Sequence, residues 1–452
     1  MKPLLRAAAG TVTALAALSL TACGSSSDGT DGTDKKPKQQ QSTPAATAPK
    51  KRIPAAFDNT KGWSVKEGSG GEELAGPVIA PDAGLVLLRS NAADGKSSRI
   101  VAHDARTGAI RWSSKPMPRP TSPDASTTTD VKVFVTHKGG KEYAVLAATG
   151  SEGGDSVNKA AGVTRLATYD TAATGKQVAP VKETTFPDLA SHGYTVQRDG
   201  GQALVSLNAS TAVVDVVSGK VTTYDEKSPV FKAPRPCPNL IGSCESGARI
   251  VGQTPTGPLV RGFRAFWAAG GWFSGDAVPA GATASQGSAD VTVYGTPGGQ
   301  AVAAWPTKKA MTNVTVWAVH DGRTGKVMAS VACTGSGNDD QLEPTVSTDG
   351  RYVIAGPTVF DVQAKRGQCF TASSARNEIE VLAVDKDGTA YGNAKEVGIS
   401  GTTNAPASVD LATGKASALP EGTLVPDLIG ADVAVFGTHT SGGEPILVYP
   451  RR

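Results

Sequence analysis

Short apolar runs separated by polar turn residues recur along most of the chain. Examples are 84–88, 132–135, 314–317 and 446–449, and Gly, Pro, Asp or Thr residues stand around them. Long windows with the 3.6-residue period of an amphipathic helix are absent from the sequence. Runs of this length that are rich in Val and aromatic residues are typical of β-strands. The pattern predicts an all-β fold for residues 55–452.

A short phrase that begins with Asp and ends with Gly recurs between these runs. Its first copy is Asp104-Ala-Arg-Thr-Gly108, followed by Trp112. The other copies run from Asp170 to Gly175, from Asp215 to Gly219, from Asp321 to Gly325 and from Asp410 to Gly414, with a weaker one from Asp361 to Gly367. The Asp carboxylate can accept hydrogen bonds from amides two or three residues further on, and the Gly supplies positive φ. We therefore assign the phrase to a turn between two antiparallel strands of one sheet, with a structural role.

The spacing of the phrase predicts a β-propeller. Its copies recur at intervals of about 40–66 residues, apart from one interval about twice as long that leaves room for a degenerate unit between Arg249 and Thr283. The segment from Asp58 to Gly62 mimics the end of the phrase without a preceding unit. We expect about eight four-stranded blades, alternatively seven, with the N-terminal strand completing the last blade.

The first 22 residues have the organisation of an export signal. Lys2 and Arg6 precede an uncharged stretch, 7–22, that is too short to span a bilayer as a helix. The stretch ends in Leu20-Thr21-Ala22-Cys23, which resembles the lipobox of bacterial lipoproteins. The resemblance implies cleavage of a signal peptide, 1–22, and attachment of diacylglycerol and acyl groups such as palmitate to Cys23. It also implies a location on the outer face of the cytoplasmic membrane; an ordinary cleaved signal is the alternative.

Residues 24–54 are polar, lack an apolar period and predict a disordered tether, so the expected domains are 1–22, 23–54 and 55–452. The whole chain has 45 basic and 41 acidic residues. The basic excess falls in the leader and tether, and the folded part is close to neutral without a basic cluster interleaved with aromatic residues. This composition argues against nucleic acid as a partner.

The phrase, with a Trp a few residues later as at Trp112, resembles the PQQ-like repeats of quinoprotein-like propellers. That superfamily includes pyrroloquinoline-quinone dehydrogenases and non-catalytic propeller lipoproteins of cell envelopes. The Ala-, Gly- and Thr-rich composition resembles exported lipoproteins of high-GC Gram-positive bacteria. A repeat phrase specifies a scaffold and not an activity. The dehydrogenases carry an adjacent pair of cysteines that this chain lacks, so we predict neither PQQ nor calcium as a cofactor.

Four further cysteines predict disulfides. They are Cys237, Cys244, Cys333 and Cys369, and an even number in an exported chain favours two bridges. Three connectivities are possible, of which we favour Cys237–Cys244 and Cys333–Cys369, the second linking the last strands of neighbouring blades. A zinc site is the alternative, but the spacings lack paired Cys-x-x-Cys knuckles, and we predict no metal site.

Two groups of side chains are candidates for chemistry or binding. His103 and His320 each precede the Asp of a phrase, which indicates a repeated hydrogen bond at the turn. An aromatic cluster at 263–273 could line a site for a sugar, peptide or protein partner, or could pack between blades, which we favour. Its binding candidates are Phe266, Trp267 and Trp272.

No catalytic residues are assigned, because neither a His-Glu-x-x-His motif nor a Gly-x-Ser-x-Gly elbow occurs in the sequence. We therefore expect a lipid-anchored extracytoplasmic propeller that binds an envelope protein or extracellular ligand without catalysis. A quinoprotein-type oxidoreductase, or another propeller enzyme of the cell envelope, is the alternative.

Overall fold

The structure is a computed structural model that describes residues 45–452, apart from a set of short segments. The segments left out are 67–72, 121–130, 154–156, 159, 188–194, 200, 208–209, 237–242, 285–290, 309–312, 336–341, 399–400 and 438–444. Cys23 and Cys237 lie outside the described residues.

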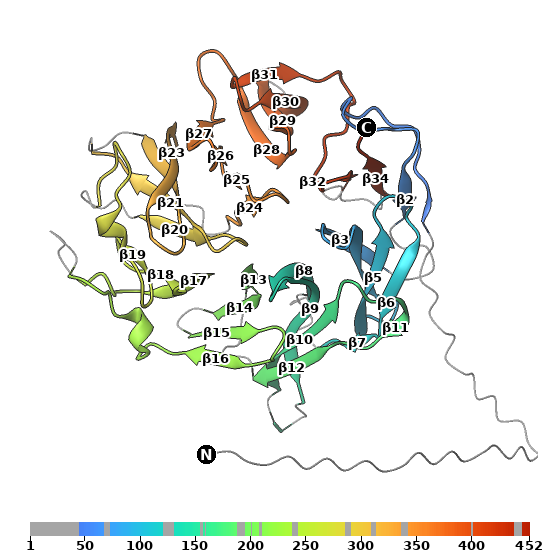
Figure 1. Ribbon diagram of the computed structural model, residues 1–452, viewed down its shortest axis with the longest axis horizontal. Coiled ribbons are helices and arrows are strands. Elements are labelled where there is room, and N and C mark those ends of the chain that lie inside the picture. Colours follow the sequence, from blue (N-terminus) through green and yellow to red (C-terminus); the bar gives the residue numbers. More distant parts are fainter. Residues whose placement is uncertain are drawn as a thin grey trace, which may run out of the picture. The chain divides into compact units, whose positions relative to one another are not determined.

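The described residues, 45–452 without the segments named above, contain eight small sheets arranged in a ring (Figure 1). This arrangement confirms the predicted all-β propeller and decides for eight blades over seven. The first strand of a blade lies nearest the centre of the ring, as β3, β8 and β13 show in Figure 1. Within the described part of the chain, no helix has the length and apolar character that crossing a membrane requires.

The first four blades contain the following strands. Blade 1 has β3 (Glu73–Ala80), β4 (Leu85–Asn91), β5 (Ser97–Asp104) and β6 (Ile110–Ser114), joined by β7 (Met117–Pro118) and β11 (Gly175–Val178). Blade 2 has β8 (Val131–Lys138), β9 (Lys141–Glu152), β10 (Ala161–Asp170) and β12 (Lys182–Pro187). Blade 3 has β13 (Thr195–Asp199), β14 (Gln202–Leu207), β15 (Ser210–Asp215) and β16 (Val221–Tyr224). Blade 4 has β17 (Arg249–Thr254), β18 (Gly257–Arg261) and β19 (Phe266–Ala268).

The other four blades complete the ring. Blade 5 has β20 (Thr292–Gly295), β21 (Ala301–Pro306), β22 (Val314–His320) and β23 (Val327–Thr334). Blade 6 has β24 (Thr345–Val346), β25 (Tyr352–Ala355), β26 (Thr358–Asp361) and β27 (Arg366–Cys369). Blade 7 has β28 (Glu378–Val384), β29 (Thr389–Gly398), β30 (Gly401–Asp410) and β31 (Lys415–Ala418). Blade 8 has β32 (Leu428–Ile429), β33 (Val433–Phe436), β34 (Ile446–Pro450), β2 (Trp63–Val65) and β1 (Ala46–Thr47).

The two ends of the domain meet in blade 8, which confirms that the N-terminal strand completes the last blade. β2 pairs antiparallel with β34, so that Trp63 lies opposite Val448. The Asp58 amide donates to the carbonyl of Pro450 at 2.8 Å, across the junction of the two termini. Closure of the ring in this way removes exposed sheet edges.

The folded part begins earlier than the sequence predicts, because residues 45–54 lie on the propeller instead of in the tether. β1 pairs with β2, Ala48 is buried, and the Leu424 amide donates to the carbonyl of Arg52 at 2.9 Å. Ala48 and Ile53 pack into an apolar cluster between blades 7 and 8. These few apolar positions are hidden in the sequence by the exposed basic residues between them.

Blade 2 departs from the predicted hairpin at its phrase. The residues after Gly175 form β11, which pairs parallel with β6 of blade 1, opposite Trp112 and Ser114. The fourth strand of blade 2 is instead β12, which follows a few residues later. The assignment of the segment after Gly175 to the same blade is therefore wrong. The parallel strand covers the outer edge of β6, which would otherwise present unpaired backbone groups.

Blade 4 is the degenerate unit that the long interval between phrases predicts, and its described residues form three strands instead of four. After β19 an isolated antiparallel bridge pairs Trp267 with Phe273. Two short 3-10 helices, η1 (Pro229–Phe231) and η2 (Ser274–Asp276), flank this blade along the chain.

Apolar side chains fill the junctions between neighbouring blades. Leu87 and Trp112 of blade 1, for example, pack with Leu146 and Tyr169 of blade 2 in one buried cluster. Comparable clusters lie at the other junctions around the ring, including the seam between blades 8 and 1. The core is therefore divided into wedges between sheets, which fix the positions of the turns on the faces of the ring.

Candidate functional site

The repeated phrase forms a hydrogen-bonded turn at the end of the third strand of a blade. In blade 1, Asp104 Oδ1 accepts hydrogen bonds from the amides of Arg106 at 3.2 Å and Thr107 at 3.0 Å, and from the Thr107 hydroxyl at 2.9 Å. The Gly108 amide donates to the Asp104 carbonyl at 2.8 Å, with Gly108 at φ +72°. Burial alone would raise the pKa of Asp104, but the hydrogen bonds from Thr107 and Arg106 lower it.

Most other copies have the same geometry. The carboxylates of Asp215, Asp321 and Asp410 each accept a hydrogen bond from the amide three residues further on. Gly219, Gly325 and Gly414 close the turns with φ between +72° and +73°. Asp170 accepts from the amide of Ala172 alone among the described contacts, and Gly175 has φ +99°. This longer copy is the one whose following strand joins the neighbouring blade.

Three of these turns accept a hydrogen bond from a tryptophan of the preceding blade. The indole Nε1 atoms of Trp63, Trp112 and Trp272 donate to the carbonyls of Ala105, Thr171 and Gly322 at 2.9, 3.1 and 2.9 Å. Each acceptor follows the Asp of a phrase in the next blade. The Trp63 ring also lies against Gly108, where a Cβ atom would stand 2.7 Å from Trp63 Cγ. Glycine is therefore required at Gly108 by space as well as by φ.

His103 and His320 have the structural role that their position before the phrase suggests. Their Nδ1 atoms lie 2.8 Å from the carbonyl of Gly108 and 2.9 Å from that of Gly325, so Nδ1 carries the proton. His103 stacks on Trp63 and His320 on Trp272. Burial lowers the pKa of both imidazoles, that of His320 to about 4. Both side chains are neutral parts of the core at pH 7.

A disulfide joins Cys333 in β23 to Cys369 in β27, and thus the outer strands of blades 5 and 6. This pairing confirms the prediction for these two cysteines. Cys244 is also disulfide-bonded. The predicted partner of Cys244, Cys237, lies outside the described residues.

The structure buries the three aromatic binding candidates. Phe266 and Trp267 are fully buried and Trp272 is 9% exposed. Phe266 and Trp272 belong to the apolar cluster between blades 4 and 5, and Trp267 to the one between blades 3 and 4. The three aromatic side chains therefore pack between blades, as the favoured interpretation of this aromatic cluster predicts.

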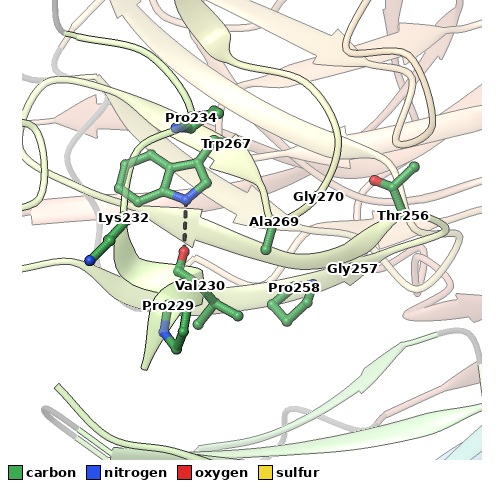
Figure 2. A pocket seen from close by; sticks show the side chains of 10 residues that line it. All are labelled: Pro229, Val230, Lys232, Pro234, Thr256, Gly257, Pro258, Trp267, Ala269 and Gly270. Atoms are coloured by element: carbon green, nitrogen blue, oxygen red, sulfur yellow. Dashed lines mark hydrogen bonds between the residues drawn. The ribbon is translucent and has the colours of Figure 1, made fainter. Parts of the chain in front are cut away.

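An open groove lies beside one edge of Trp267 (Figure 2). Its volume is about 360 Å³, and the lining is formed by Pro229, Val230, Lys232, Pro234, Thr256, Gly257, Pro258, Trp267, Ala269 and Gly270. The indole Nε1 of Trp267 is already occupied, because it donates to the carbonyl of Val230 at 2.9 Å. The groove therefore offers mainly apolar surface, with Lys232 as its one charged residue.

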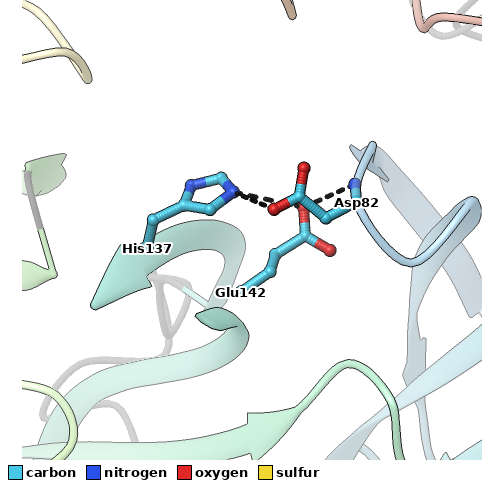
Figure 3. Close-up of side chains that lie close together, drawn as sticks. All are labelled: Asp82, His137 and Glu142. Carbon is cyan, nitrogen blue, oxygen red and sulfur yellow. Dashed lines mark hydrogen bonds and ion pairs between the residues drawn. The ribbon is translucent and has the colours of Figure 1, made fainter. Parts of the chain in front are cut away.

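Three side chains with metal-ligating atoms meet where blades 1 and 2 adjoin (Figure 3). Asp82 stands in the turn between β3 and β4, and His137 and Glu142 flank the turn between β8 and β9. His137 Nε2 lies 3.2 Å from Asp82 Oδ2 and 3.6 Å from Glu142 Oε1. We call Asp82, His137 and Glu142 the blade 1–2 cluster.

The environments of these three side chains differ sharply. The Glu142 side chain is 2% exposed, whereas those of His137 and Asp82 are 51% and 63% exposed. The Glu142 carboxylate accepts hydrogen bonds from the amides of Asp82 and Ala83, both at 3.2 Å. Burial raises the pKa of Glu142, and these hydrogen bonds partly offset the increase.

Sequence reasoning missed this cluster because Asp82 belongs to a different blade from the other two residues. The signals present were an Asp-Ala-Gly turn at Asp82 and a His and a Glu at the two ends of one hairpin. None of these is specific alone. Only the packing of blade 1 against blade 2 brings them together.

A small pocket lies on the other side of the same β3–β4 turn. It has a volume of about 180 Å³ and is formed by residues of blades 8 and 1, among them Pro81, Ala83 and Asp432. Arg106 Nη2 lies 2.8 Å from Asp432 Oδ2 in an exposed ion pair. In antiparallel blades the first and third turns point the same way, so the pocket, the blade 1–2 cluster and the phrase turns share one face.

No family model matches the chain, and no curated protein matches it. Among solved structures it is similar to dipeptidyl peptidase 4 of Porphyromonas gingivalis, with 10% identity and a TM-score of 0.42, covering 85% of this chain and 58% of that one. It is also similar to the acylaminoacyl peptidase of Pyrococcus horikoshii, with 10% identity and a TM-score of 0.35, covering 83% and 50% of the two chains.

The extracellular domain of a one-component system protein from B. thetaiotaomicron is similar at 11% identity and a TM-score of 0.34, covering 88% of this chain and 40% of that one. The chain thus spans 58% or less of the length of these three proteins. The eight closed blades of the structure itself identify the chain as a β-propeller.

Proposed function

We propose that this protein is a lipid-anchored, extracytoplasmic β-propeller that binds a partner of the cell envelope without catalysis. Two observations support the proposal. The sequence that ends at Cys23 resembles a lipobox, and the residues described from Ala45 onwards form a closed propeller. In this proposal Cys23 carries the lipid and holds the propeller at the outer face of the cytoplasmic membrane.

The observation that supports the proposal best is the way in which the N-terminal part joins the fold. β2 is hydrogen-bonded to β34 and β1 to β2, so the chain enters the propeller through the blade that closes it. A lipid on Cys23 would hold the whole ring through residues 24–44 alone. Basic residues in that stretch, such as Lys35 and Lys36, would add weak attraction to anionic headgroups.

The binding surface is assigned to the face that carries the phrase turns. Turns positioned by a rigid scaffold are where binding residues concentrate. On this face the pocket between blades 8 and 1 lies beside the blade 1–2 cluster, and together they offer a concavity and exposed charges. We expect the partner to be a protein that inserts side chains into this pocket of about 180 Å³.

The anchoring is tested by the intact mass and the membrane fraction of the native chain and of Cys23→Ala. The native protein is expected in the membrane with Cys23 as its first residue and the added mass of diacylglycerol and acyl groups. Cys23→Ala should be soluble or unprocessed. Cys369→Ser is the matched control, because it removes another cysteine and should leave the protein in the membrane.

A native protein without lipid, or one cleaved at another residue, would contradict the anchoring. Catalysis is tested separately with the purified protein, PQQ, calcium and a dye as electron acceptor. We expect no turnover, and a quinone-dependent oxidation would favour the alternative of a quinoprotein-type oxidoreductase.

A further inference from the structure

We propose that Asp82, His137 and Glu142 form a binding site for a divalent transition-metal ion of the zinc class. The site would join the β3–β4 turn of blade 1 to the β8–β9 hairpin of blade 2. This inference is independent of the proposed function and replaces the expectation, drawn from the cysteine spacings, that the chain has no metal site.

The distances in the cluster match those between ligands of one ion. Two ligand atoms that are each about 2.1 Å from a tetrahedral zinc ion lie about 3.4 Å apart. The observed separations are 3.2 Å between His137 Nε2 and Asp82 Oδ2 and 3.6 Å between His137 Nε2 and Glu142 Oε1. The ligand atoms of all three residues lie within 4.8 Å of one another. A common centre for the three ligand atoms would require rotation of the exposed Asp82 and His137 side chains.

The charges of the cluster favour a cation. Two carboxylates face one imidazole, and in the described residues the close contacts of the Asp82 and Glu142 carboxylates with a basic side chain are to the His137 ring, which carries a positive charge only when protonated. Lys138, which follows His137 in the hairpin, is engaged elsewhere, with its Nζ 2.9 Å from Asp215 Oδ2 of blade 3. Glu142 is the strongest argument, because a carboxylate that is 2% exposed has lost most of its hydration and gains from a positive ion.

The surrounding backbone holds the ligands in place before an ion arrives. The amides of Asp82 and Ala83 donate to the two oxygens of Glu142, which fixes this carboxylate and ties it to the turn that carries Asp82. The Gly201 amide donates to Thr136 Oγ1 at 2.7 Å, which fixes the strand next to His137. Outer hydrogen bonds of this kind orient metal ligands and raise affinity.

The donor set indicates the class of ion. One imidazole nitrogen and two carboxylate oxygens suit zinc and its neighbours, whereas calcium and magnesium prefer oxygen ligands alone. Three protein ligands leave a fourth position, and the exposure of Asp82 and His137 leaves that position open to water or to a donor group of a bound partner.

The test is calorimetric titration of zinc into the full-length chain in detergent after treatment with a chelator. We expect one saturable site per chain in the native protein. His137→Ala and Asp82→Asn should each weaken it by more than about 100-fold, because loss of a ligand costs more than loss of an outer-shell partner. Both side chains are more than half exposed, so these variants are expected to keep the fold.

Glu226→Gln is the matched control, because it removes an exposed carboxylate of the loop after blade 3 and should leave the affinity unchanged. Thermal unfolding without zinc verifies that each variant is folded. Cobalt provides a second readout, since tetrahedral coordination gives visible absorption that His137→Ala should abolish. Native protein without a saturable site, or His137→Ala binding as tightly as the native chain, would overturn the proposal and leave the cluster as a hydrogen-bonded contact between blades.

Discussion

Substitution of Gly108 by Ala should destabilise the propeller at the seam where its ends meet. Gly108 has φ +72°, and a Cβ atom there would stand 2.7 Å from Trp63 Cγ and 2.8 Å from the Cβ of Ala45. The left-handed backbone costs an alanine about 1–2 kcal/mol. Displacement of a packed tryptophan adds about 1–3 kcal/mol, so the total expected loss is about 2–5 kcal/mol.

Gly422→Ala separates the two contributions. Gly422 has φ +73°, and nothing lies within 4 Å of its Cβ position, so only the backbone cost of about 1–2 kcal/mol applies. The assay is equilibrium unfolding in urea, monitored by tryptophan fluorescence, with the midpoints of the two variants compared. Equal losses in Gly108→Ala and Gly422→Ala, within about 0.5 kcal/mol, would refute the inference that Trp63 packs on this turn.

Three further predictions concern the blades and their junctions. Cys333→Ser should lower the thermal midpoint in non-reducing buffer, by a loss of about 2–4 kcal/mol for a bridge between residues 36 apart, and an unchanged midpoint would contradict this. Trp112→Phe keeps most of the packing but leaves the Thr171 carbonyl without its donor, so urea unfolding should show a loss of about 1–3 kcal/mol. The pKa of His320 is lowered to about 4 from 6.5, so its stabilising contribution is present above pH 6.5 and is lost as the pH falls towards 4. When the pH falls from 7 to 4, the free energy of unfolding of the native chain should therefore drop by up to about 3 kcal/mol more than that of His320→Gln. The same drop in both proteins, measured by urea unfolding at the two pH values, would contradict the burial of a neutral imidazole.

The fold was predictable because it depends on local chemistry that repeats. The carboxylate of Asp104 and the positive φ of Gly108 define a turn from five residues alone, and the period between copies gives the blades. The phrase at Asp170 shows the limit of this reasoning. Its local sequence predicts a hairpin, but the strand after Gly175 pairs with the free edge of β6 in the neighbouring blade. This pairing depends on the tertiary structure and not on the local sequence.

The candidate site was not predictable for the opposite reason. The blade 1–2 cluster depends on the packing of one blade against the next, and Asp82 and His137 share no motif or spacing in the sequence. The aromatic residues at 266–272 are conspicuous in the sequence, yet they mark packing between blades. In this protein the conspicuous group of aromatic residues thus belongs to the core, whereas the blade 1–2 cluster can be found only from the three-dimensional structure.

The central claim is that the propeller binds an envelope partner while it is held at the membrane. The most direct test is crosslinking in intact cells, followed by purification and mass spectrometry, for the native protein and for Cys23→Ala. The account predicts one envelope protein in stoichiometric amount with the native chain and its loss with Cys23→Ala. A native chain that yields no stoichiometric protein and instead retains a quinone with substrate turnover would contradict it.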